Sequence, residues 1–63
     1  MNYINERVLE EANYIIETNN TIRETAKVFK VSKSTIHKDI SDRLKSINKQ
    51  KYIEIEKILK QHI

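Results

Sequence analysis

The chain has 63 residues and a net charge of +3, and it contains no Gly, Pro or Cys. The lack of Cys excludes disulfides and thiolate metal sites, and no apolar run is long enough to cross a bilayer or to act as a signal peptide. We therefore expect one small cytoplasmic domain over residues 1–63. A chain of this size buries only about 60% of its unfolded surface, so it is marginally stable alone.

Charge is unevenly distributed along the chain. Residues 1–20 contain one Arg and four Glu, whereas residues 21–51 contain nine Lys or Arg and only three acids. Residues 52–63 are neutral overall. A positive charge confined to one segment is typical of proteins that bind a polyanion. A merely solubilising surface would explain the lysines but not the acidic first twenty residues.

Apolar residues recur every three or four positions, which predicts an all-α fold. The first helix has about four turns, and its stripe is formed by Ile4, Val8, Leu9, Ala12, Ile15 and Ile16. Asn19 and Asn20 follow and suit a turn, because Asn tolerates the left-handed backbone region.

Residues 21–44 read as two short helices joined by a tight turn. Thr21 can cap the first of them, and Glu24 stands three residues later to complete a capping box. Ile22, Ala26 and Phe29 then face inward, with the small Ala26 suited to a close helix crossing. Val31 fills the corner, and Ser32 can cap the second helix. Its inward stripe is Ile36, Ile40 and Leu44.

The turn contains one unusual residue. A glycine often occupies such a turn, since one residue there adopts positive φ. In this chain the position falls on Lys30, which we expect to be left-handed at a cost of about 1 kcal/mol.

The last helix follows a break in the period after Leu44. Asn48 can cap it, with Ile47 and Tyr52 placed as a hydrophobic staple. Its inward residues are expected to be Tyr52, Ile55, Ile58 and Leu59. The chain is thus predicted to be a four-helix domain containing a helix-turn-helix.

Polar side chains lie opposite the apolar stripe of the second helix of the pair, about residues 33–44. At about 100° per residue, Ser34, Lys38 and Ser41 point away from that stripe. In a helix-turn-helix this face enters the major groove. The candidate base-contacting residues are Lys33, Ser34, His37 and Lys38. The candidate phosphate-contacting residues are Thr21, Arg23, Lys30, Ser32, Thr35, Ser41, Arg43 and Lys45.

Several of these roles remain open. Lys33 and Lys38 suit guanine or phosphate equally, and Ser34 and Thr35 suit either bases or backbone. Arg23 is almost as well suited to pairing with an acid. Asp39 points toward the core side and is interpreted as structural, since DNA repels an acid.

Other chemistry has little support in the sequence. His37 and His62 are the only histidines, and no ligand spacing accompanies them, so no metal is predicted. There is no Gly-rich phosphate loop or thiol nucleophile, so we predict neither enzymatic activity nor a cofactor. His62 suits a helix C-terminus. The four aromatic residues Tyr3, Tyr14, Phe29 and Tyr52 are expected to pack in the core.

The segment VSKSTIHKD at residues 31–39 resembles the stage III sporulation protein D family of bacterial transcriptional regulators. Shorter similarities occur in order at Tyr3-Ile4, Glu6-Arg7, residues 14–17, residues 21–23, Arg43-Leu44 and Ile47-Asn48. The resemblance implies sequence-specific binding to double-stranded DNA and gene activation or repression in the mother cell of a spore former. Two departures are Lys30, where the family usually has Gly, and the lack of the family's basic segment after the last helix.

Alternative interpretations stay open at this point. If 63 residues is the natural length, affinity should be weaker, or a second subunit would supply contacts as a weak homodimer on DNA. A plasmid- or phage-borne relative would have no role in sporulation. The runner-up functions are a helical adaptor for an acidic protein, and the DNA-targeting module of a recombinase or transposase.

Overall fold

The computed structural model describes residues 3–60, and every regular element in that range is helical. The elements are α1 (Tyr3–Thr18), α2 (Ile22–Phe29), α3 (Lys33–Lys38), the π-helical turn η1 (Asp39–Arg43), α4 (Leu44–Ile47) and α5 (Lys49–Lys60). Because α3, η1 and α4 follow one another without a break, we call them together the 33–47 helix. The described chain therefore forms four helices, and the all-α prediction is confirmed.

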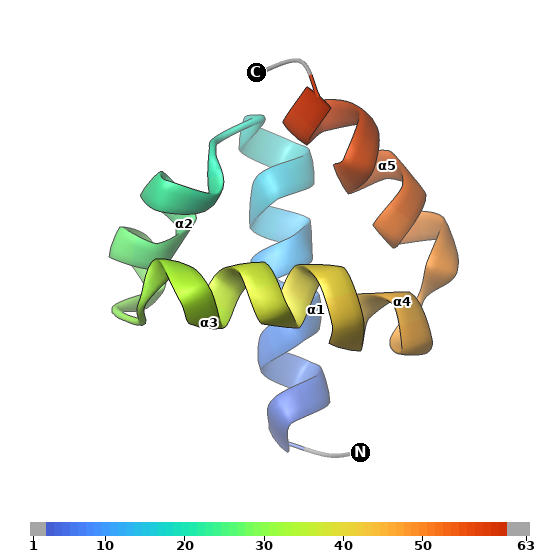
Figure 1. The fold of residues 1–63 in the computed structure, drawn as a ribbon, viewed down its shortest axis with the longest axis horizontal. Helices are drawn as coiled ribbons and strands as arrows, with labels where there is room; N and C mark the ends of the chain where they lie inside the picture. The colour runs from blue at the N-terminus through green and yellow to red at the C-terminus, as the bar shows by residue number, and fades with distance from the viewer. Residues whose placement is uncertain (1–2, 61–63) are drawn as a thin grey trace.

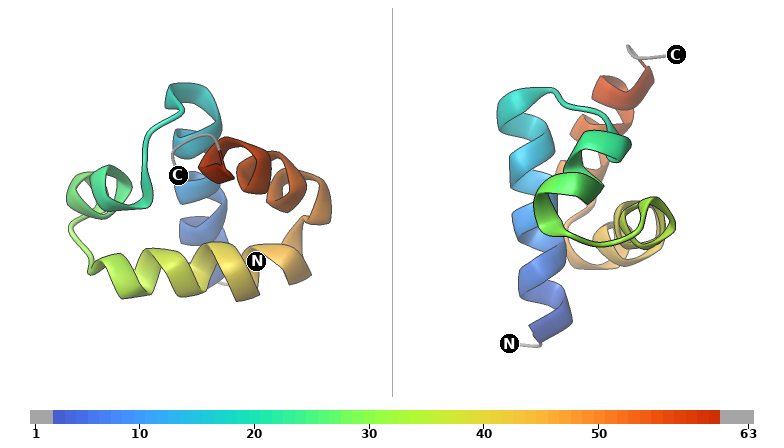
Figure 2. Two further views of the ribbon diagram at one scale, coloured as in Figure 1. Left: turned by 45° about the horizontal axis from the view of Figure 1, so that its top comes forward. Right: turned by 90° about the vertical axis from the view of Figure 1, so that its left-hand side faces the viewer.

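Helix α1 is the centre of the fold, since it packs against α2, η1, α4 and α5. The 33–47 helix crosses α1, with α2 on one side and α5 on the other (Figure 1). Helix α2 contacts α3, and α5 contacts α4, so the two outer helices lie over opposite ends of the 33–47 helix (Figure 2). The side of the 33–47 helix that is turned away from α1 is left uncovered by the described helices (Figure 2).

All four helices contribute to one apolar core. The buried residues are Val8, Ala12, Ile15, Ala26, Ile36, Ile40, Leu44 and Ile55. Leu9, Ile16, Ile22, Val31, Ile47, Tyr52, Ile58 and Leu59 pack around them while partly buried. The predicted inward stripes are thus confirmed for most positions, because helical spacing alone decides which residues share a face.

The first turn of α1 departs from the prediction. Tyr3 is 78% exposed and Ile4 is 37% exposed, so placing them in the core was wrong. This end of α1 extends past the 33–47 helix, where no other described helix covers it (Figure 1). Phe29 is half-buried and packs edge-to-face against Tyr14, with ring centroids 5.9 Å apart. The interpretation of His62 lies outside the described residues.

The 33–47 helix contains a π-helical turn that the sequence did not reveal. The Leu44 backbone N–H donates to the carbonyl of Asp39, five residues earlier. In an α-helix, residues four apart drift by about 40° around the axis, so three residues at that spacing would spread over a wide arc. A π turn rotates less per residue, and this keeps Leu44 on the core side with Ile36 and Ile40. The helix then continues to Ile47, so the predicted end at Leu44 was three residues short.

Candidate nucleic-acid interface

The three predicted N-caps form locally, and two of them frame the helix pair. Thr21 Oγ1 accepts the Glu24 backbone N–H at 3.2 Å, and Ser32 Oγ accepts the Thr35 N–H at 3.1 Å. Asn48 Oδ1 accepts the Lys51 N–H at 3.1 Å at the start of α5. Within residues 3–60 the reciprocal bond of the Thr21 capping box is not made. The Glu24 carboxylate instead lies 3.7 Å from Lys27 Nζ.

The turn between α2 and α3 is built on a left-handed lysine. Lys30 has φ 57° and ψ 43°, as predicted for the position where glycine is usual. Its N–H donates to the carbonyl of Lys27, and the Val31 N–H donates to the carbonyl of Ala26. This pair of bonds is the Schellman arrangement that ends a helix. It turns the chain sharply enough for Ser32 to begin α3 at once. Asn19 ends α1 in the same left-handed region, with φ 57°.

The outward face of α3 carries the four candidate base-contacting residues. Lys33, Ser34, His37 and Lys38 are all exposed. Their side chains take part in no hydrogen bond or ion pair that is found within residues 3–60. Ile36 on the opposite side is fully buried, which fixes the orientation of this helix against the core. The geometry therefore presents two cations, a hydroxyl and an imidazole together on the side that no other described helix covers.

The candidate phosphate-contacting residues differ in how far they are already engaged. Arg23 and Lys30 are exposed, and no acid within residues 3–60 pairs with Arg23, the alternative that the sequence left open. Ser32 and Thr35 are occupied in the cap, with their hydroxyl oxygens 2.8 Å apart. Lys45 places its ammonium 5.8 Å from the centroid of the Tyr52 ring, a cation–π geometry.

The remaining candidates lie at the edges of the face. Thr21 is half-buried and engaged in its cap, and Ser41 is half-buried on η1. Arg43 is held by Asp39, with 2.5 Å between Nη1 and Oδ1, while its side chain stays 42% exposed. Asp39 itself is fully buried, which confirms the structural role predicted for it.

The sequence reasoning missed a buried charged cluster behind this face. Glu11 and Asp39 are fully buried, with Arg7 and Arg43 beside them. Burial raises the pKa of Glu11 to about 8, and the nearby charge of Asp39 acts in the same direction. One signal was available, because Glu11 lies on the α1 stripe, three residues after Val8 and four before Ile15.

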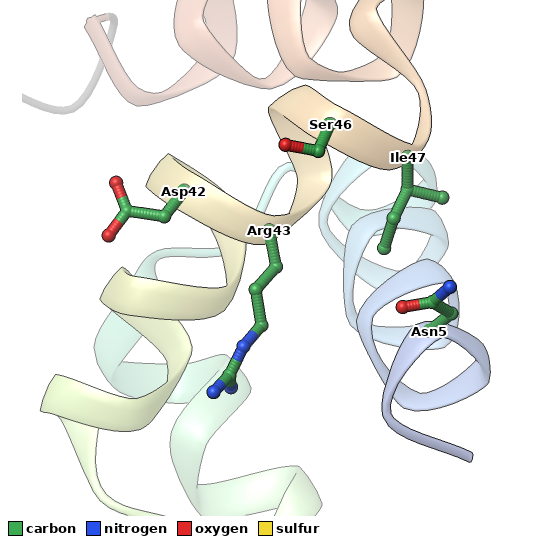
Figure 3. A pocket seen from close by; sticks show the side chains of 5 residues that line it. All are labelled: Asn5, Asp42, Arg43, Ser46 and Ile47. Carbon is green, nitrogen blue, oxygen red and sulfur yellow. The ribbon is translucent and has the colours of Figure 1, made fainter. Parts of the chain in front are cut away.

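An open pocket of about 490 Å³ lies beside this cluster, and it is lined by Asn5, Asp42, Arg43, Ser46 and Ile47. Figure 3 shows the Arg43 side chain extending away from Asp42 and Ser46. No group of three or more His, Asp or Glu side chains in the described residues is arranged to hold a metal ion. None of the described helices is long and apolar enough to span a membrane.

Comparison with known proteins identifies relatives of the chain. The sequence profile of the family described as Stage III sporulation protein D matches residues 1–63. The chain belongs to the stage III sporulation protein D family. This confirms the resemblance carried by residues 31–39, which now form the Ser32 cap and the outward face of α3.

The curated Stage III sporulation protein D of Bacillus subtilis (strain 168) is 48% identical over 60 residues. The alignment covers 95% of this chain and 64% of that family member. The chain thus spans a little less than two thirds of the length of the relative it matches. No solved structure gives a significant match to the chain.

Proposed function

We propose that this chain is a sequence-specific, double-stranded DNA-binding regulator of transcription in sporulation, and that the 33–47 helix lies in the major groove. The observation that carries the proposal is the outward face of α3. Lys33, Ser34, His37 and Lys38 are exposed there without partners among the described residues, directly after a capped turn. Family membership supports this class of function, because the family is one of sporulation regulators rather than of enzymes.

The residue chemistry divides this surface into two roles. A lysine donates to guanine O6 and N7, and serine contacts several base edges, so the side chains of α3 suit base reading. Phosphate contacts instead fix register and orientation without direct sequence information. We assign that role to the flanking residues Thr21, Arg23, Lys30, Ser32, Thr35, Ser41, Arg43 and Lys45.

The lysines of α3, unpaired among the described residues, favour a polyanion as the partner. A lysine that is already paired with an acid must lose that partner before it meets a phosphate, and Lys33 and Lys38 have none within residues 3–60. Three exposed acids lie on a different helix, α1, at Glu6, Glu10 and Glu17. The positive field of residues 21–51 therefore remains available on the uncovered side of the fold.

The test is binding to duplex DNA at increasing salt. If four to six basic residues meet phosphates, the logarithm of affinity should fall against the logarithm of salt with a slope of about −0.9 per contact. Single strands of the same sequence should bind much more weakly than the duplex. A flat salt dependence, or capture of an acidic protein in place of duplex DNA, would favour a helical adaptor instead.

The charge-matched control is Lys57→Ala on α5. Lys57 is exposed, as is Lys38, and it lies outside the proposed interface. Its loss removes the same formal charge, so Lys57→Ala should leave the salt slope almost unchanged. If Lys38→Ala and Lys57→Ala change duplex binding equally, net charge rather than the α3 face governs binding.

A further inference from the structure

The buried carboxylate of Asp39 joins α1 to the π turn of the 33–47 helix. Asp39 accepts from Arg7 Nη2 of α1 at 3.2 Å through Oδ2, and from Arg43 Nη1 at 2.5 Å through Oδ1. Asp39 is fully buried, whereas the Arg7 and Arg43 side chains are 30% and 42% exposed. The two arginines, from α1 and η1, therefore share one buried acceptor and each binds a different oxygen of it.

Glu11 completes the cluster in an unusual way. Its side chain is fully buried and lies 3.5 Å from Arg7 Nε, yet neither carboxylate oxygen accepts a hydrogen bond from the described residues. An ionised carboxylate buried without hydrogen bonds is costly. A protonated Glu11 removes that cost, because a neutral acid is buried far more readily than a carboxylate. Burial accordingly raises the pKa of Glu11 to about 8.

Within residues 3–60, the charged groups that act on Glu11 come from two elements. Arg7 lies on α1, and Asp39 and Arg43 lie on η1. On two other helices packed on α1, Lys51 of α5 donates to Asn13 and the Thr25 hydroxyl of α2 donates to the carbonyl of Thr21. The proton on Glu11 is therefore controlled by burial, by Asp39 and by the two arginines.

The cluster also lies where the 33–47 helix changes its winding. The carbonyl of Asp39 accepts the Leu44 N–H that closes the π turn, while its carboxylate holds Arg7 and Arg43. The single residue Asp39 thus contacts α1, the π turn and Arg43. π-Helical turns inside α-helices are frequent at functional sites.

We propose that Arg7 and Glu11 of α1 are positioning residues for DNA binding, which act through Asp39 to hold the π turn and to present the Arg43 guanidinium to the DNA backbone. The inference rests on the proposed function. Arg7 donates to one oxygen of Asp39, and Glu11 lies 3.5 Å from Nε of the same arginine, so the two α1 residues keep the other Asp39 oxygen directed at Arg43. The exposed part of Arg43 is then available to a phosphate.

The first test needs no DNA and follows the proton on Glu11. The native state holds this proton from the ordinary pKa of 4.5 up to about 8, whereas the unfolded chain has released it. The resulting stability is complete below the ordinary value and is lost as the pH rises through about 8. The melting temperature of the unchanged protein should therefore fall between pH 5 and pH 8.5 more steeply than that of Glu11→Gln, whose amide is uncharged at every pH.

Glu10→Gln is the matched control, since Glu10 precedes Glu11 on α1 and is exposed. It should keep the slope of the unchanged protein. Equal slopes for Glu11→Gln and the unchanged protein would overturn the role assigned to Glu11.

The second test is a double-mutant cycle measured by duplex DNA binding at pH 7. Arg7→Gln should weaken binding about tenfold, equivalent to about 1.4 kcal/mol, when Arg43 is present. In the Arg43→Gln background the same change should have little further effect, because the two residues act through one carboxylate. Equal losses in both backgrounds would indicate a general structural role and overturn the inference.

Two further measurements keep the outcomes separate. Circular dichroism must show each variant folded. If Arg7→Gln unfolds, Arg7→Lys replaces it in the cycle. Arg7→Lys should weaken DNA binding less, and this loss should again disappear in the Arg43→Gln background. Failure of the unchanged protein to bind any duplex would overturn the proposed function and this inference together. Binding by the unchanged protein without coupling in the cycle would overturn this inference alone.

Discussion

On the inward side of the 33–47 helix, the buried Asp39 holds two arginines, whereas on the outward side Lys33 and Lys38 are exposed and have no acid partner within residues 3–60. Charges on the inward side have their partners inside the fold, so they contribute mainly to orientation, and only the exposed part of Arg43 is proposed to reach DNA. Those on the outward side keep their full charge for a partner molecule. The charged residues on one side of this helix thus hold the fold together, and those on the other side are available to bind a partner molecule. Residues of the two sides alternate along the sequence.

The largest expected effect comes from breaking the inward side. Ile36 is fully buried, and Ile36→Ala should destabilise the protein by about 2–4 kcal/mol, as truncations in a packed core do. In a domain this small, much of the chain could unfold. Urea denaturation followed by circular dichroism measures the change. Val28→Ala, at a residue that is 52% exposed, is the control and should cost less than about 1 kcal/mol.

The next largest effect sharpens the outward side. Lys38→Ala should reduce specific DNA affinity by about 1–3 kcal/mol and relax the preference at one base position. Arg23→Ala should weaken binding to all sequences about equally, because phosphates carry no direct sequence information. Selection from a random duplex pool measures both effects, with circular dichroism confirming the folded state. If Arg23→Ala changes the selected sequence and Lys38→Ala does not, the groove helix is wrongly assigned.

Two serines near the start of α3 should differ in their contribution to stability. Ser32 accepts the Thr35 N–H at the start of α3, and Ser32→Ala should cost about 1 kcal/mol of stability, as the loss of an N-cap does. Ser34, two residues later, makes no side-chain hydrogen bond within residues 3–60, so Ser34→Ala should change stability by less than about 0.5 kcal/mol. Thermal unfolding of both variants decides the point. Similar losses at the two positions would show that the cap is not what stabilises α3.

The smallest effect concerns the turn. Lys30 is left-handed, and Lys30→Gly should stabilise the protein by up to about 1 kcal/mol, since glycine adopts this region without steric cost. The same change removes a proposed phosphate contact, so DNA affinity should fall and the salt slope should lose about 0.9. A loss of stability in the unfolding experiment would contradict this account of the turn.

Much of the helix pair was predictable because its determinants are local. The hydroxyls of Thr21 and Ser32 bond to backbone N–H groups three residues ahead, and Lys30 falls where the turn requires positive φ. The stripe of Ile36, Ile40 and Leu44 was visible as a spacing. Tyr3 was misplaced for the opposite reason, because spacing shows which face a residue occupies but not whether another helix covers that face.

The exposed face of α3 was also predictable, since the residues opposite a buried stripe must point outward. The sequence did not show that the side chains of this face would lack partners inside the fold. It also did not show which arginines would pair with an acid. Nothing near Arg23 in the sequence showed whether an acid from a distant helix would pair with it. For Arg43 such an acid lies only one turn away, at Asp39, and the sequence did not show that the two would bond.

The sequence by itself determined the helices, their caps, the left-handed turn and the side of each helix that is apolar. These depend on hydrogen bonds and periodicities within a few residues, which remain the same whatever the distant chain does. The tertiary structure decided the π turn, the burial of Glu11 with its raised pKa, and the bond between Arg7 and Asp39, which are 32 positions apart. Each of these depends on the crossing of α1 by the 33–47 helix, because only that contact removes the water from two carboxylates and brings two arginines to one of them.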